Sequence, residues 1–246
     1  MKTTKYTFVL LLLFGIFTFQ SCENESLDSD FFSNVNDEDD IDDTNDGNDD
    51  TTGTGEESTG DYWPRAIGNM WDFNDTFYGE VNYNMIGTEE IDGNTYYKFD
   101  DLFNQEAWLR KSGDSYFIRN AVGGFPIEGY EVSTTFITVK MLEDTANVGD
   151  QWSSNVSYTI SYVATNPAFP EIPDIDFSAV YNFEMIGRDL SRTVEGEDYQ
   201  NVLQVRLSLS ASGASSTVDY FYAKDIGLIE FIGDQSSGTL FNYNIN

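Results

Sequence analysis

Apolar and polar residues alternate along much of the chain from residue 61 onward, and this alternation limits the fold more than any other feature. The stretch "VLQVRLSLSAS" (202–212) changes character at most positions. A period of two places apolar side chains on one face of a β-strand, whereas an amphipathic helix repeats about every 3.6 residues. No run of a dozen residues here shows the helical period. The sequence therefore predicts an all-β region.

Short polar turns separate these strands and predict antiparallel pairing. "DGN" (92–94) joins "EEI" to "TYYKF" and is the strongest hairpin signal in the chain, because Asp-Gly favours a tight turn. A second hairpin is predicted over 107–119 with Gly113 in its turn, and two more strands are predicted over 218–233. We expect an antiparallel, curved sheet, either a half-barrel or a sandwich.

Three segments occur twice and in the same order, which indicates an internal repeat. The pairs are "IGNMW" (67–71) and "VGDQW" (148–152), "MIG" (85–87) and "MIG" (185–187), and "IDGNTY" (91–96) and "VEGEDY" (194–199). The region holds 31 aromatic residues, enough for one core. We interpret 61–246 as a single β domain built from two related halves, about 61–147 and 148–246. Similar hairpin chemistry that arose independently is the alternative.

The second half carries an insertion that the first half lacks. It includes "NPAFPEIPDIDF" (166–177), with three of the five prolines, which disfavour a central strand and favour a stiff loop. Phe169, Ile172 and Ile175 lie on this loop. A long loop with apolar residues either folds over the core as a lid or meets a partner. The lid is the preferred interpretation.

The amino end has the features of an export signal. Lys2 and Lys5 precede an apolar run from Tyr6 to Phe19, which is shorter than the roughly 20 residues that cross a bilayer. Cys22, the only cysteine, follows directly on Ser21. This arrangement resembles the lipobox of bacterial lipoproteins. It implies that 1–21 is a lipoprotein signal peptide and that lipid on Cys22 anchors the protein to a membrane. An ordinary signal peptide and an uncleaved membrane helix are the alternatives.

Residues 22–60 are predicted to be the lipidated cysteine followed by a disordered acidic linker. Between Glu23 and Glu57 the chain has 15 acidic residues and no Lys or Arg, and few apolar ones. Such a segment cannot bury enough surface to fold. Acidic residues directly after Cys22 also resemble a signal that sends some lipoproteins to the cell surface. We expect an exported protein at the outer membrane, with the cell surface as one destination.

The composition excludes several classes of chemistry. The chain has no histidine, which removes Ser-His-Asp and Cys-His nucleophile arrangements and zinc sites built on histidine. We therefore predict no catalytic residues, no metal site and no cofactor. From Asp61 onward, 28 acidic and 10 basic residues give a net charge of −18, which disfavours nucleic acid as a partner.

Three blocks of the chain carry a family resemblance. They are "YWPRAIGNMWDF", "NVGDQW" and "YFYAKDIGLIEF". They resemble the G-N-x-W, V-G-D-x-W and Y-Y-A-K-x-x-G-L-V blocks of an uncharacterised family of secreted, β-rich bacterial lipoproteins. The resemblance implies an exported location and a β-sheet fold, and it carries no established activity.

Two functions are compatible with these features. The preferred one is a non-catalytic binding or scaffold module for a glycan, an apolar ligand or a protein partner. Its candidate contact residues are Trp63 and Trp108, expected at the surface, together with the loop residues Phe169, Ile172 and Ile175. By contrast, Trp71 and Trp152 are expected in the core.

The alternative is a carboxylate-dependent glycoside hydrolase, which needs two suitably spaced acids and no histidine. Acid pairs such as Glu89 and Glu90, Asp100 and Asp101, or Asp174 and Asp176 are available. So many acids produce pairs by chance, and adjacent residues on a strand point to opposite faces. We interpret these pairs as parts of a solvated acidic surface.

Overall fold

The computed structural model describes residues 61–246 except 103–104, 122–124, 128, 212–213 and 235. These residues form strands and turns without a helix, which confirms the predicted all-β class. No helix long and apolar enough to cross a membrane occurs among them. The predicted signal peptide, Cys22 and the predicted linker lie outside the described residues.

Fourteen strands lie within the described residues. They are β1 (Met70–Asp75), β2 (Gly79–Ile91), β3 (Asn94–Leu102), β4 (Gln105–Ser112), β5 (Ser115–Ala121), β6 (Phe125–Ile127), β7 (Tyr130–Thr134), β8 (Ile137–Glu143), β9 (Gln151–Ala164), β10 (Ile175–Val194), β11 (Glu197–Ala211), β12 (Ala214–Ala223), β13 (Gly227–Gly233) and β14 (Ser237–Asn244).

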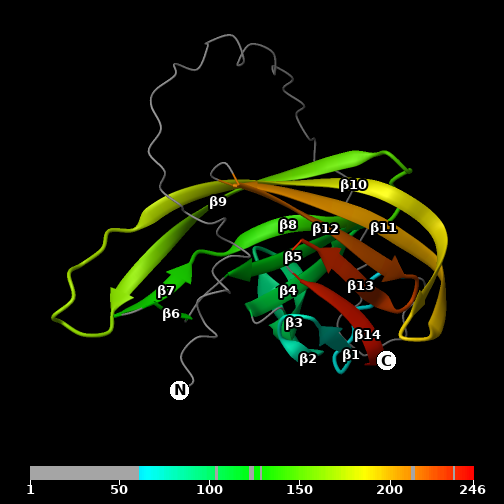
Figure 1. The fold of residues 1–246 in the computed structure, drawn as a ribbon, viewed down its shortest axis with the longest axis horizontal. Helices are drawn as coiled ribbons and strands as arrows, with labels where there is room; N and C mark the ends of the chain where they lie inside the picture. Colours follow the sequence, from blue (N-terminus) through cyan, green and yellow to red (C-terminus); the bar gives the residue numbers. More distant parts are fainter. Residues whose placement is uncertain (1–60, 103–104, 122–124, 128, 212–213, 235) are drawn as a thin grey trace, which may run out of the picture. The chain divides into compact units, whose positions relative to one another are not determined.

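All the strands belong to one antiparallel sheet. Its order is β6-β7-β9-β10-β11-β12-β13-β14-β1-β2-β3-β4-β5-β8. Figure 1 shows the sheet curving from the long strands β9 to β11, through β13 and β14, to β1 and β2. The predicted curved antiparallel sheet is confirmed. The strands form a single rolled sheet, as in the expected half-barrel, and not the two separate sheets of a sandwich.

The predicted hairpins are also present. Asp92 and Gly93 join β2 to β3 with φ angles of 52° and 76°, the left-handed geometry of a tight two-residue hairpin turn. Gly113 adopts φ 53° between β4 and β5. The two strands predicted over 218–233 are β12 and β13, and a short turn that includes Asp225 connects them. Turn residues that can be recognised in the sequence therefore locate three of the connections between strands.

The repeated sequence segments share backbone geometry. Gly68 N donates to Met85 O at 2.8 Å, and Gly149 N donates to Met185 O at 2.8 Å. Both methionines directly precede a shift in strand register. The first copies of the repeated segments lie in β1 to β3 and the turns beside them, and the second copies lie in β9 to β11 and the turns beside them. The two stretches are thus built alike, and together they contribute to one sheet.

The free edge of β8 lies beside β9. β7 pairs with the outer part of β9, and Thr135 N continues this ladder by donating to Thr159 O at 3.0 Å. Farther along, side chains replace the ladder: Trp152 Nε1 donates to Lys140 O, and Lys140 N donates to Ser154 Oγ, both at 3.1 Å. The rolled sheet is therefore joined across this seam by side chains rather than by paired strands.

The enclosed face of the sheet holds one large aromatic core. Trp71, predicted in the core, is fully buried there with Phe73 and Phe99. Trp152, its counterpart in the second half, is partly buried and stacks on Phe183 with ring centroids 5.7 Å apart. The prediction is confirmed for Trp71, whereas Trp152 lies at the margin of the core and is only partly buried.

Candidate functional site

The segment before β1 enters the core instead of lying on the surface. Trp63 is only 3% exposed, and its ring lies 5.6 Å from that of Tyr222 and 6.2 Å from that of Phe99. The expectation of an exposed Trp63 is therefore wrong. Phe99 lies in β3 and Tyr222 in β12, so the side chain of Trp63 packs between two strands that are far apart in the sequence. The buried ring has no exposed surface on which an external ligand could stack.

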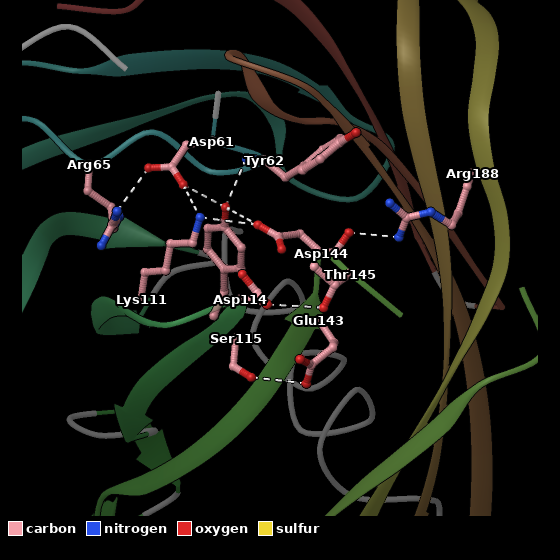
Figure 2. Close-up of polar contacts among 11 residues, drawn as sticks. Asp61, Tyr62, Arg65, Lys111, Asp114, Ser115, Glu143, Asp144, Thr145 and Arg188 are labelled. Carbon is pink, nitrogen blue, oxygen red and sulfur yellow. Dashed lines mark hydrogen bonds and ion pairs between the residues drawn. The ribbon is translucent and has the colours of Figure 1, made fainter. Parts of the chain in front are cut away.

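A charged network holds this segment in place. It consists of Asp61, Arg65, Lys111, Tyr116 and Asp144 (Figure 2). Asp61 Oδ2 lies 2.9 Å from Arg65 Nη2, and Asp61 Oδ1 lies 2.6 Å from Lys111 Nζ. Lys111 Nζ also lies 3.1 Å from Asp144 Oδ2. One ammonium thus bridges two carboxylates from distant parts of the chain.

The Tyr116 hydroxyl completes the network. It accepts a hydrogen bond from Tyr62 N at 3.0 Å, and its single proton faces Asp61 Oδ1 at 2.7 Å and Asp144 Oδ2 at 3.0 Å. Behind Asp144, Arg188 Nη1 donates to the carbonyls of Asp144 and Ala146. β4 and β5 therefore contact the start of the folded region directly, and the turn after β8 and β10 join the network through Asp144 and Arg188.

The electrostatics of the network favour a structural role. Burial raises the pKa of Asp61, but Arg65, Lys111 and Tyr116 together outweigh burial and hold that pKa below its ordinary value. Burial also raises the pKa of Tyr116, and the Asp61 carboxylate adds to the rise. A general acid needs a carboxyl group whose pKa is raised, whereas the pKa of Asp61 is lowered. The network is suited to clamping the chain rather than to proton transfer.

Trp108 lies on the outer face of β4 but is covered. Only 4% of it is exposed, because Phe136 packs edge-on against its ring at 5.2 Å and Lys98 Nζ lies 5.1 Å from the ring centroid. Its Nε1 donates to Glu89 Oε2 at 2.9 Å. The expectation of an exposed Trp108 is therefore wrong, and the exposed aromatic at this place is Phe136.

The proline-rich loop between β9 and β10 does not lie over the main core. Phe169 packs against Tyr130 with ring centroids 5.7 Å apart, and its ring lies so close to Gly129 that any Cβ there would clash. The Tyr130 hydroxyl donates to Pro170 O at 2.7 Å. The preferred lid interpretation is corrected: the loop folds back onto the turn before β7.

This loop caps a projecting part of the sheet that we call the arm. The arm consists of β6, β7, residues 157–164 of β9, the loop 165–174 and residues 175–178 of β10. In Figure 1, β6 and β7 lie at the end of the sheet near the loop, away from β13 and β14. Tyr130, Val132 and Ile160 are buried in the arm but are not part of the main core cluster. The arm has a small apolar core of its own.

One face of the arm is apolar and half-exposed. Directly paired residues share a face in an antiparallel sheet, so the pairs Tyr158 with Phe177 and Ile160 with Ile175 lie together. Tyr158 and Phe177 stack at 6.0 Å and remain partly exposed, while Ile175 is 40% exposed. Ile175, a candidate residue that was expected on the loop, lies at the start of β10 and is exposed, whereas Ile172 is half-exposed. Tyr158 and Phe177 were missed, although alternation in "SYTISYVA" places Tyr158 on one strand face.

The opposite side of the sheet carries rows of polar side chains and a shallow hollow. The hollow, about 270 Å³, is lined by Gln151, Trp152, Ser153, Asn182, Phe183, Glu184, Arg206 and Ser208. The Arg206 guanidinium already binds the Asp219 carboxylate: Nε lies 2.7 Å from Oδ1 and Nη2 lies 2.9 Å from Oδ2. Within the described part of the chain, no group of three potential metal ligands lies together.

The comparisons with known proteins give similarities to solved structures alone. No protein-family model matches the chain, and no curated protein matches it. A crystal structure of a "putative lipoprotein" from Parabacteroides distasonis is similar with a TM-score of 0.44 and 11% identity, over 76% of this chain and 100% of that one. A "putative exported protein with YmcC-like fold" from Bacteroides fragilis gives a TM-score of 0.41 and 10% identity, over 74% and 98%.

Proposed function

We propose that the protein is an exported lipoprotein, anchored in the outer membrane through lipid on Cys22, that acts as a non-catalytic binding module and presents its arm to a partner. Residues 1–21 serve as the signal peptide, and 22–60 form the acidic linker that carries the folded region away from the membrane. We further propose membership of the uncharacterised family of secreted β-rich lipoproteins that the sequence blocks resemble.

The half-exposed apolar face of the arm is the observation that carries this proposal. Tyr158, Phe177 and Ile175 remain accessible on the face that also carries the buried residues Val132 and Ile160. Exposed apolar groups gathered on one face mark interaction surfaces, whereas single scattered ones do not. The main core, in contrast, is filled by side chains of the protein itself.

A glycoside hydrolase finds less support in the positions of the acids. Asp61 and Asp144 do face each other, but Lys111 and Tyr116 lie between them. A glycosidase needs one carboxyl kept protonated and room for a sugar between the two. The lowered pKa of Asp61 and the occupied space between the carboxylates favour the binding module.

Site-specific photo-crosslinking in intact cells tests the proposal. A photoreactive amino acid replaces Ile175 in the arm or, as the control, Ile232 on β13, which is 45% exposed and thus comparable. We expect a defined adduct from position 175 alone, and its loss in the Cys22→Ala background. Equal adducts from both positions would contradict a binding role for the arm. Absence of lipid from Cys22 in metabolic labelling would contradict the anchor.

A further inference from the structure

We propose that the outer side of β3, β4, β5 and β8, which we call the basic face, binds an acidic sugar. The carboxylate of the sugar lies at Arg110 and Arg119, and its ring lies against Phe136. Three observations support this inference: basic residues gather on one face of an acidic domain, two arginines there have no carboxylate partner in the described part of the chain, and an exposed aromatic ring lies beside them. The basic face is not part of the arm, so the inference goes beyond the proposed function and does not depend on it.

The basic face carries a large share of the cationic side chains. From Asp61 onward the chain has ten basic residues, and four of them lie on this face: Lys98, Arg110, Arg119 and Lys140. In one row across the strands, Trp108 lies opposite both Lys98 and Arg119. In the next row, Phe117 lies opposite both Arg110 and Lys140. Directly paired residues share a face of an antiparallel sheet, so cations alternate with aromatic rings along both rows.

Aromatic rings hold the two arginines in place. Arg110 Cζ lies 4.6 Å from the ring centroid of Phe117 and 5.6 Å from that of Tyr96. Arg119 Cζ lies 4.8 Å from the ring centroid of Phe136. Because they are diagonal neighbours on adjacent strands, the backbones of the two arginines are about 7–8 Å apart. Cation–π contacts position a guanidinium without using its N–H donors, so both arginines are held close together and can still donate.

The two lysines of the basic face already have acidic partners. Lys98 forms an ion pair with Glu106. Lys140 Nζ lies 2.6 Å from Glu143 Oε2. A further anion would have to compete with these carboxylates for either ammonium group. The lysines are therefore less suited than the arginines to bind a ligand.

The arginines lack such partners. Neither Arg110 nor Arg119 forms an ion pair with a described residue, although the region from Asp61 onward has 28 acids. The one side-chain hydrogen bond from Arg110 to a described residue runs from Nη1 to Asn94 Oδ1 at 2.8 Å, and its Nε is buried without a partner. A guanidinium has five N–H donors, so most of them lack an acceptor among the described residues. A partly desolvated cation with unused donors binds an anion more strongly than a hydrated one does.

The two arginines and the charge of the domain together select the kind of anion. The flat fork of a guanidinium matches the two oxygens of a carboxylate. The net charge of −18 from Asp61 onward repels a long polyanion or an anionic membrane. A ligand with a single negative charge can instead stay close to the two arginines, because other charges are screened beyond about 8 Å at physiological salt.

The surroundings of Arg119 favour a ring that carries the carboxylate. Phe136 is 42% exposed and offers a flat apolar surface beside the guanidinium. Thr138, which lies opposite Arg119, adds a hydroxyl on the same face. Binding sites for small molecules combine such aromatic surfaces with a few placed polar groups. An acidic sugar has a carboxylate, a ring with apolar faces and hydroxyl groups, whereas the acidic side chain of a peptide would leave Phe136 uncovered.

NMR titration of the purified full chain tests this inference. The probe is methyl glucuronide. Methyl glucoside has the same ring without the carboxylate, and acetate has the carboxylate without the ring. We expect methyl glucuronide to bind at least about tenfold more tightly than either. Its addition should shift the indole N–H signal of Trp108, which lies between the arginine rows, and should leave those of Trp63 and Trp71 in the core unchanged.

Variants locate the site. Arg119→Gln should weaken binding of methyl glucuronide about tenfold, and Arg119→Lys, which keeps the charge and loses the fork, about threefold. Arg206→Gln is the matched control, because Arg206 is exposed, is bound to Asp219 and lies outside the basic face, so no change is expected. Phe136→Ala should weaken binding of methyl glucuronide about threefold and leave that of acetate unchanged. Circular dichroism and urea unfolding check that each variant remains folded.

Four outcomes would overturn the inference. Equal binding of methyl glucoside would mean that the carboxylate is not recognised. Equal binding of acetate would mean that the ring is not recognised and that any carboxylate, including that of an acidic peptide, is accepted. Wild-type binding by Arg119→Gln would place the site elsewhere, and absence of any shift with methyl glucuronide would exclude this ligand chemistry. None of these results bears on crosslinking at position 175, which tests the proposed function separately.

Discussion

Gly68, which precedes β1, and Gly149, which precedes β9, have the same backbone geometry. Each has φ 92°, and each donates its N–H to the carbonyl of a methionine, Met85 or Met185, at 2.8 Å. That methionine's N–H in turn donates to the carbonyl of the residue after the glycine, Asn69 or Asp150, at 2.9 and 3.0 Å. A reciprocal pair of bonds therefore fixes the turn before β1 and the turn before β9 in one geometry.

Alanine at either glycine should destabilise the fold. A φ of 92° lies where residues with a Cβ are strained, so we expect a loss of about 1–2 kcal/mol for Gly149→Ala, where added carbon meets no neighbour. Gly68→Ala should lose at least as much, because its Cβ would meet Asn246 Nδ2 at 2.8 Å. Urea unfolding at neutral pH measures both. Gly87→Ala is the control: its φ is not in the left-handed region and its Cβ meets nothing, so little change is expected.

Removing the Asp61 carboxylate should release the segment before β1. Asp61→Asn leaves Lys111 with one carboxylate instead of two and weakens the contacts with Arg65 and Tyr116. The side chains are largely but not fully buried, so we expect a loss of about 2 kcal/mol. Asp114→Asn is the matched control, since exposed Asp114 makes one side-chain bond, to Thr145 at 3.3 Å. Equal losses in the two variants would contradict the role of the network.

The contribution of Asp61 should also depend on pH in a defined direction. Its pKa in the folded protein lies below the ordinary value of about 3.9, so the folded state binds fewer protons near that pH than the unfolded state does. The stabilisation is therefore complete above about pH 4 and is lost as the pH falls through the folded pKa. Urea midpoints of the wild type and Asp61→Asn should converge between pH 5 and acid pH, about 2 to 3. A difference that stays constant with pH would show that ionisation of Asp61 is not its source.

The sequence predicts local features of this fold better than contacts between distant segments. Alternation and turn residues such as Asp-Gly correctly located β2, β3 and the other paired strands. Each of these signals depends only on residues that lie close together in the chain. The sequence also predicted a surface position for Trp108. It could not show that Phe136, 28 residues later, covers Trp108.

The same limit explains the errors at Trp63 and the proline-rich loop. Trp63 precedes the first strand, so no alternation assigns it to a face, and its neighbours Phe99 and Tyr222 are distant in the chain. The loop is stiff, as its prolines predict, but its position depends on the close approach of Phe169 to Gly129, about 40 residues earlier. The sequence shows that such a loop exists and does not show what it packs against.

Truncation of Trp63 should unfold much of the protein rather than remove a ligand contact. The side chain is buried between β3 and β12, and large-to-small changes at such positions cost about 3–5 kcal/mol. We expect Trp63→Ala to lose that amount in urea unfolding, and Trp63→Phe, which keeps a ring beside Tyr222, to lose clearly less. If Trp63→Ala were as stable as the wild type, this segment would not be part of the core.

Tyrosines on the enclosed face of β10 to β12 should make the protein sensitive to alkali. Burial raises the pKa of Tyr181 to about 12, and it also raises the pKa of Tyr220 and Tyr222. In the unfolded chain these hydroxyls ionise near pH 10. Between about pH 10 and 12 the folded state therefore holds protons that the unfolded state has released, so stability falls as the pH rises. Tyr181 alone should account for about 1 kcal/mol at pH 11.

Tyr181→Phe separates this effect from general alkaline damage. Phenylalanine keeps the ring and removes the ionisable group, so the decline of the urea midpoint between pH 9 and 11 should be shallower in the variant by about 1 kcal/mol. Absorbance at 295 nm should show tyrosinate forming in the wild type later than in the urea-unfolded chain. Identical declines in the two proteins, together with early titration of all tyrosines, would mean that water reaches the hydroxyl of Tyr181 in the folded state.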